Sequence, residues 1–190
     1  MAPKPKITRE AILEAAMEIV RHEGMETLNV RRIAAELQCS TQPVMTHFPS
    51  MASLKDALYE AADAYHSGFL MQPDSTQEDP MLSIGLQYVR FAAQERELFR
   101  FLMQSEHFRS HRMQDMTNMP ELAPILEILR TEAQITAEQS RQAFSALFYA
   151  VHGMASLLAN NTMPFDESYC ADVLVNVFMG VIGMMKGEAE

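Results

Sequence analysis

The sequence predicts an all-α protein: an N-terminal tri-helical helix-turn-helix domain followed by a larger helical domain, about nine helices in total. Apolar residues recur at i, i+3, i+4 and i+7 along most of the chain, which is the period of a helix with one buried face. No segment alternates apolar and polar residues with the period of two that a strand shows. With 48% hydrophobic and 21% charged residues in 190, the chain has enough apolar side chains for a core.

Three helices are expected within the first 50 residues. The first covers residues 9–23, the second residues 30–37 and the third residues 41–48. The third is expected to begin after Ser40, whose hydroxyl can cap a backbone N–H of its first turn. The short connection at residues 38–40 joins the second and third helices, and this arrangement is typical of a helix-turn-helix.

The remainder is also expected to be helical, apart from a polar loop bracketed by prolines at residues 72–80. We expect residues 1–50 and 51–190 to form two domains, with residues 51–70 as a linking helix. The other expected helices lie at residues 81–94, 98–105, 107–116, 120–129, 136–160 and 166–186.

Charge is distributed unevenly along the chain. The formal net charge is −10, which by itself does not favour a nucleic-acid partner. Residues 1–50 hold six basic and six acidic residues, so the whole excess of negative charge lies in residues 51–190. A neutral N-terminal domain can present a local basic face to DNA while the acidic remainder stays in solvent.

Cysteine usage and the N-terminus indicate a cytoplasmic protein. Cys39 and Cys170 are far apart and match neither a disulfide framework nor a metal-binding motif. The first residues lack the apolar core of a signal peptide, and no run of 18 apolar residues occurs, so no membrane span is expected.

The expected helix-turn-helix carries side chains that suit DNA. In such a unit the last helix enters the major groove, where its first residues contact base edges. Thr41, Gln42 and Thr46 supply the hydroxyl and amide groups that read bases or bind phosphates. Arg31 and Arg32, at the start of the preceding helix, are candidates for phosphate contacts.

Residues 7–58 resemble the DNA-binding domain of the TetR (tetracycline-repressor-like) family. The matching stretches are ITREAILEAAMEIVRHEGMETLNVRRIAAELQCS and TQPVMTHFPSMASLKDAL, with Val30-Arg31-Arg32-Ile33-Ala34, Ser40, His47-Phe48 and Leu54 in the family register. The resemblance implies a homodimeric transcription regulator that binds a palindromic double-stranded DNA operator and is released by a small apolar effector. The DNA-binding residues expected on this basis are Arg31, Thr41, Gln42, Pro43, Thr46, His47 and Lys55.

Three positions depart from the family pattern. Gln38 stands in the turn where the family commonly has glycine, and Met45 and Thr46 stand where it commonly has aromatic residues. Met51 occupies the position of a phosphate-contacting lysine, for which Lys55, one turn further on, is a possible substitute.

The last two long helices are expected to form the dimer interface. The stretch Phe148–Gly153 resembles a TetR subgroup with a Trp-x-x-x-His-Gly signature, in which Phe148 replaces the tryptophan. In the family these helices form a four-helix bundle with their symmetry mates. Residues 166–186 carry two apolar stripes where a surface helix needs one, and a twofold mate can cover the second. The alternative is a helix central to its own monomer. The expected interface residues are Val173, Val177, Phe178, Val181 and Met184.

An apolar effector pocket is implied by the same resemblance, since such sites combine apolar walls with a few polar groups. For each candidate, and for His152 in particular, a role in the core is the alternative. His107 and His111 would share a helical face compatible with zinc, but the sequence offers no third ligand, so no metal and no cofactor are expected. The candidate pocket residues are Tyr88, Phe91, Phe99, Leu102, Met103, Met113, Met116, Phe144, Phe148 and His152.

Two other classes of function remain open at this point. A helix-turn-helix-derived protein–protein adaptor without DNA binding is the alternative, motivated by Met51 and by the net charge. An enzyme is the least expected class, because the sequence contains no phosphate-binding loop, nucleophile elbow or paired-carboxylate motif, and no catalytic residue is assigned.

Overall fold

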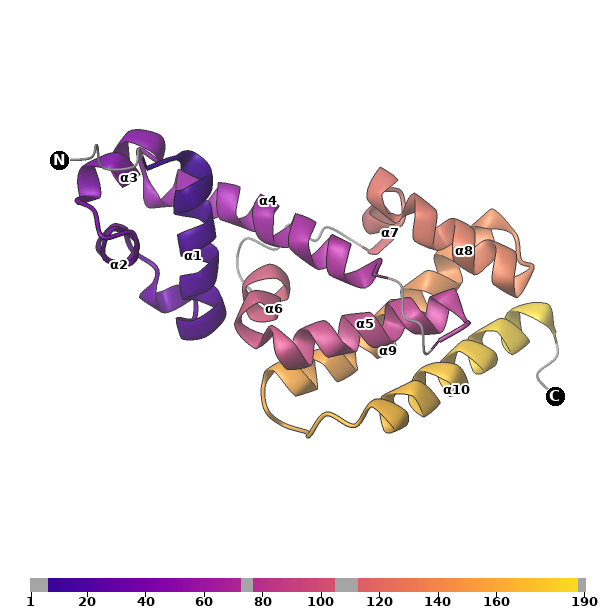
Figure 1. Cartoon of the computed structure of the whole chain (residues 1–190). Helices are drawn as coiled ribbons and strands as arrows, with labels where there is room; N and C mark the ends of the chain where they lie inside the picture. The colour runs from indigo at the N-terminus through magenta and orange to yellow at the C-terminus, as the bar shows by residue number, and fades with distance from the viewer. Residues whose placement is uncertain (1–6, 73–76, 105–112, 188–190) are drawn as a thin grey trace. The chain divides into compact units, whose positions relative to one another are not determined.

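The computed structural model describes residues 7–72, 77–104 and 113–187 (Figure 1). All regular secondary structure in these residues is helical, with ten α-helices, of which α7 has only four residues, and two short 3₁₀ helices. The predicted all-α class is therefore confirmed.

The described residues form two compact units. The N-terminal unit contains residues 7–67 and 95–104, and the C-terminal unit contains residues 68–94 and 113–187. The functional division at residue 50 stays a prediction. The helices of the N-terminal unit are α1 (Arg9–Glu23), α2 (Val30–Glu36), α3 (Thr41–His47), most of α4 (Met51–Leu70) and α6 (Arg96–Met103). The C-terminal unit holds α5 (Pro80–Gln94), α7 (Met113–Met116), α8 (Ala123–Ala133), α9 (Ala137–Ala159) and α10 (Glu167–Lys186).

Side-chain caps define where the first two helices begin. Thr8 Oγ1 accepts a hydrogen bond from the N–H of Ala11, and Asn29 Oδ1 accepts one from the N–H of Arg32 at 3.0 Å. Ser40 precedes α3 as predicted, but its hydroxyl makes no capping hydrogen bond, so the expected cap is wrong.

The core of the N-terminal unit joins α1 to α2, α3 and α6. Helices α2 and α3 contact each other and α1, and α6 packs against α1. The completely buried side chains of these elements include Ile12, Ile19, Ile33, Leu98, Phe99 and Leu102. This packing holds α3 against α1 and α2.

Helix α9 is the centre of the C-terminal unit, with α5, α8 and α10 packed around it. Its start carries a capping box, in which Thr136 and Gln139 bind each other's backbone N–H groups. Arg90 of α5 makes a bidentate ion pair with Glu167 of α10, at 2.6 and 2.7 Å.

Helices α9 and α10 are also the two most apolar long helices. Both have the length and composition of a membrane span, yet only 33% and 22% of their most apolar windows are buried. Length and composition are weak evidence for a span, because a helix from the core of a soluble protein passes the same test. Several of their large apolar side chains are exposed, namely Tyr149, Leu157, Val175, Met179 and Met184.

Candidate nucleic-acid interface and effector site

The turn between α2 and α3 is a Schellman motif. The N–H of Cys39 donates to the carbonyl of Ala34 at 2.9 Å, and the N–H of Gln38 donates to that of Ala35 at 3.1 Å. Gln38 adopts φ +50°, the left-handed conformation that favours glycine. The family's glycine position is thus a conformational requirement, which this chain meets with glutamine.

Helix α3 exposes one polar face and buries the other. Thr41, Gln42 and Thr46 are exposed, whereas Val44 and the following Phe48 are buried. The Thr46 hydroxyl donates to the carbonyl of Gln42 at 2.9 Å, one turn earlier. Three of the predicted DNA-binding side chains therefore share the outer face of one short helix.

The end of α3 is attached to the start of α1. His47 Nε2 lies 3.1 Å from the carbonyl oxygen of Ile7, so a protonated Nε2 donates to it. The Arg9 guanidinium lies 5.0 Å from the centroid of the Phe48 ring, a cation–π contact. His47 thus anchors the segment that leads into α1, a role that its expected place among the DNA contacts did not suggest.

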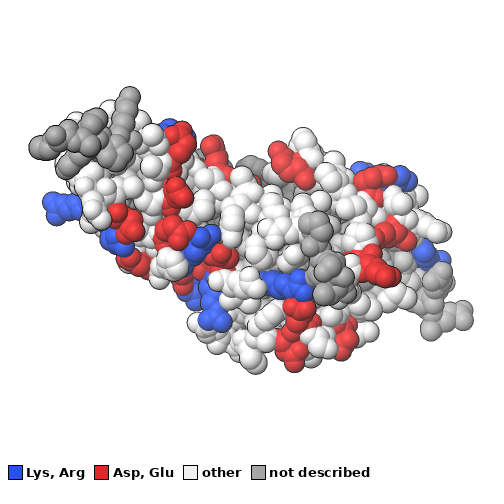
Figure 2. Space-filling view, in the orientation of Figure 1, with Lys and Arg blue, Asp and Glu red and all other residues white. Residues whose placement is uncertain are grey.

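The two arginines of α2 differ in availability. Arg32 donates to Glu23 at 2.5 Å and to Glu36 at 2.8 Å, so its charge is already balanced. Arg31 is exposed and Lys55 is half-buried on α4. On the face drawn in Figure 2, acidic and basic side chains are interspersed over the described residues. Of the two arginines, Arg31 is better placed to contact a phosphate, because it is exposed whereas Arg32 is already paired with two carboxylates.

A half-buried charged cluster connects α1, α4 and the start of α6. Arg21 Nε donates to Glu95 at 2.8 Å, and the Tyr65 hydroxyl donates to the same carboxylate at 3.1 Å. The Arg21 guanidinium also lies 5.1 Å from the centroid of the Tyr65 ring. Burial, and then the Glu95 carboxylate, raise the pKa of Tyr65. No local sequence pattern predicts this cluster, because 74 residues separate Arg21 from Glu95.

Four of the predicted pocket residues form one aromatic cluster between α5 and α9. The Tyr88 hydroxyl lies 2.9 Å from His152 Nδ1. The rings of Phe148 and His152 stack at 5.3 Å and an angle of 17°, and Phe144 stacks on Phe148 at 5.9 Å. Burial lowers the pKa of His152 and raises that of Tyr88. The neutral imidazole is thus favoured, and one of its nitrogens is held by tyrosine.

The other predicted pocket residues lie elsewhere. Phe91 is buried and contacts the Phe69 ring edge-on, with centroids 5.3 Å apart. Phe99, Leu102 and Met103 lie on α6 in the N-terminal unit, where the first two are completely buried. Met116 lies on α7, and the side chain of Met113 falls outside the described residues.

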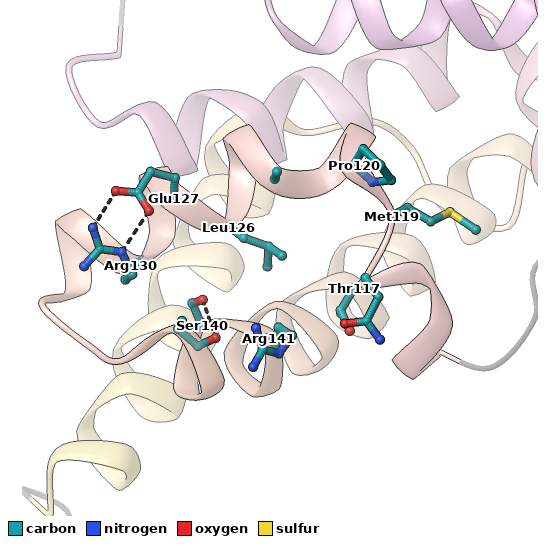
Figure 3. Close-up of a pocket in the computed structure, with 11 residues that line it drawn as sticks. Thr117, Met119, Pro120, Leu126, Glu127, Arg130, Ser140 and Arg141 are labelled. Atoms are coloured by element: carbon teal, nitrogen blue, oxygen red, sulfur yellow. Dashed lines mark hydrogen bonds and ion pairs between the residues drawn. The ribbon is translucent and has the colours of Figure 1, made fainter.

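A pocket that sequence analysis did not anticipate lies between α8 and the start of α9 (Figure 3). Its volume is about 320 Å³. Arg130, paired with Glu127 on α8, forms one side, and Arg141 of α9 another. Its lining residues are Thr117, Asn118, Met119, Pro120, Ala123, Leu126, Glu127, Arg130, Ala137, Ser140 and Arg141.

His107 and His111, the pair that lacked a third ligand for zinc, lie outside the described residues. Within residues 7–72, 77–104 and 113–187, no group of three metal-ligating side chains occurs.

The predicted dimer residues on α10 differ in exposure. Phe178 and Val181 are partly buried against one apolar cluster of their own unit, and Val173 is partly buried against a second one. Met184 is 67% exposed. Val175 and Met179, which were not predicted, are also exposed, and with i, i+4 spacing they share a face.

Comparison with known proteins finds similarity in the N-terminal helices. Residues 12–62 match the family described as "Bacterial regulatory proteins, tetR family". The HTH-type transcriptional repressor DrrR1 of Streptomyces coeruleorubidus is 38% identical over 58 residues, or 30% of this chain and 22% of that protein. The Tetracycline repressor protein class C of Escherichia coli is 39% identical over 56 residues, or 30% and 26%. The chain thus spans about a quarter of the length of the curated relatives it matches.

A solved structure extends the likeness in fold to nearly the whole chain. A single-residue variant of TetR from Acinetobacter baumannii AYE, in complex with minocycline, superposes with a TM-score of 0.59. The match covers 97% of this chain and 100% of that one, at 18% sequence identity. At this identity the likeness concerns the fold alone. The subgroup with the Trp-x-x-x-His-Gly signature is not confirmed.

Proposed function

We propose, from the TetR-family N-terminal domain that residues 12–62 carry, that the chain is a sequence-specific DNA-binding transcription regulator. The observation that supports this most directly is α3, a short helix with a polar outer face held by a Schellman turn. Such a helix enters the major groove, where amide and hydroxyl groups read base edges. The family match to bacterial regulatory proteins favours this function over an adaptor or an enzyme.

The DNA contacts divide into two kinds. Thr41 and Gln42, with Thr46 one turn later, face the bases. Arg31 and Lys55 bind phosphates of the DNA backbone on either side of these bases. Pro43 and His47, both half-buried, position the helix and the start of α1.

The active species is a homodimer, held together by α9 and α10. Their exposed apolar side chains, Tyr149 at 63%, Met179 at 64% and Met184 at 67%, need cover in water. A twofold mate covers both copies of the same face at once. The dimer places two copies of α3 one DNA turn apart, about 34–36 Å, on a palindromic operator.

A small apolar effector releases the dimer from DNA. The stacked column of Phe144, Phe148 and His152, with Tyr88 beside it, offers flat apolar surface and one hydrogen-bonding pair. An effector that binds one dimer geometry better than the other lowers operator affinity by the coupling free energy, about 1–3 kcal/mol in typical cases. Repression is the expected mode of action, and the cytoplasm the expected location.

Selection from a random double-stranded DNA library tests the proposal. The wild-type dimer is expected to enrich a palindrome, and gel-shift titration is expected to give weaker binding for Gln42→Ala with an unchanged dimer. Gln72→Ala, at an exposed glutamine just after α4, is the matched control. Failure to enrich any sequence at low salt would favour the adaptor.

A further inference from the structure

One large apolar side chain lies within the polar outer face of α3. Met45 is 41% exposed, although its neighbour Val44 is completely buried. Successive residues of a helix are about 100° apart, so Met45 lies about 40° from Thr41 and about 60° from Gln42 around the axis. Met45 therefore lies between Thr41 and Gln42, two of the three residues that are proposed to face the bases.

The surroundings of Met45 give this face a mixed chemistry. The Thr46 hydroxyl donates its proton to the carbonyl of Gln42, so Thr46 offers DNA its methyl group and an acceptor. The Gln42 amide keeps both a donor and an acceptor on its outer end. Met45 is unbranched and flexible, which lets it fit against a small apolar group.

Only one base presents an apolar group in the major groove. Thymine carries a C5 methyl there, whereas the other bases present hydrogen-bond donors and acceptors. Glutamine at such a position pairs with N6 and N7 of adenine. We propose that Met45 contacts the C5 methyl of a thymine in each operator half-site, adjacent to the base read by Gln42. This inference rests on the proposed function.

Deoxyuridine provides a sharp test, because it differs from thymidine only by lacking the C5 methyl. In the operator selected by the wild-type protein, each thymine of the half-site is replaced in turn, on both half-sites together. We expect one position at which wild-type affinity falls about fourfold per half-site, or about fifteenfold for the dimer, the effect of losing one buried methyl. Met45→Ala is expected to bind the thymine operator more weakly and to lose nothing further on that substitution.

Met45→Leu and Thr46→Ser complete the experiment. Met45→Leu retains an apolar side chain and is expected to keep sensitivity to the missing methyl, while Thr46→Ser removes the neighbouring methyl from α3 and is expected to leave that sensitivity unchanged. Thermal unfolding and sedimentation identify any variant whose fold or dimer is altered.

The outcomes separate this inference from the proposed function. If the wild-type protein selects no DNA, the proposed function fails and the inference falls with it. If DNA is selected, but the half-site lacks thymine or Met45→Ala remains as sensitive to deoxyuridine as the wild type, only the role of Met45 is refuted.

Discussion

Replacement of Gln38 by glycine is expected to stabilise the protein. Gln38 has φ +50° at the end of α2, where the left-handed conformation costs a residue with a Cβ atom about 1–2 kcal/mol. Its side chain is exposed, so little packing is lost on truncation. Glycine offsets about 0.5–1 kcal/mol of this gain through its greater freedom in the unfolded chain. The net increase in the free energy of unfolding is therefore about 0.5–1 kcal/mol.

Urea and thermal unfolding measure this effect at a fixed protein concentration, because a dimer's stability depends on concentration. For a chain of this size the increase corresponds to roughly 1–4 °C in Tm. Gln38→Ala keeps the strained backbone and is expected to change the free energy of unfolding by only a few tenths of a kcal/mol. Gln42→Gly, inside α3, is expected to lose about 1 kcal/mol.

The difference in the free energy of unfolding between Gln38→Gly and Gln38→Ala measures the strain at this position. If Gln38→Gly were no more stable than Gln38→Ala, the left-handed conformation would store no strain in solution. The Schellman turn would then have to differ from the one described.

Three other predictions concern DNA, the dimer and pH. Arg31→Ala is expected to reduce the slope of log affinity against log salt by about 1.8 for the dimer, because each protomer loses one phosphate contact. Arg31→Lys should keep the slope, and an unchanged slope in Arg31→Ala would show that Arg31 does not contact phosphate. Met179→Asp is expected to weaken dimerisation about a hundredfold or more in sedimentation experiments, because it places a charge in an apolar interface. Met71→Asp, at a methionine that is 51% exposed, should leave the dimer intact. Equal effects of the two substitutions would contradict the proposed interface. Burial lowers the pKa of His66 from 6.5 to about 4, so the unfolded chain takes up the proton first as the pH drops. The free energy of unfolding should therefore fall between pH 6.5 and pH 4, by roughly 3 kcal/mol in all. Urea unfolding at several pH values checks this, and His66→Gln should lose this part of the pH dependence if His66 is its source.

Much of the helical architecture could be predicted because its signals are local. The periodic apolar residues predicted α1, α3, α5, α9 and α10 to within a few residues. Thr8 and Asn29 cap the helices that follow them, since a cap depends only on residues three positions apart. Ser40 shows the limit of such reasoning, because the suitable side chain is present but makes no capping bond.

The candidate site was predictable only in part. The exposed face of α3 follows from spacing within one helix, and Thr41, Gln42 and Thr46 lie on it, while their contacts with DNA stay a prediction. Local sequence does not predict that Arg32 is paired with Glu23, because that carboxylate lies on α1, outside α2. Val175 and Met179 were missed, because which of several apolar stripes a helix leaves exposed depends on its neighbours.

The sequence by itself determined the helical class, the order of the elements and the likeness of residues 12–62 to the tetR family, since these follow from contacts within a few residues and from a short ordered pattern. Only the tertiary structure decided which charges are paired, as in the cluster of Arg21, Tyr65 and Glu95, and which aromatic residues meet, as Tyr88 and His152 do. The physical reason is the same in both cases. Partners 30 to 74 residues apart in the chain are brought within hydrogen-bond distance only by the packing of whole helices, which no local pattern encodes.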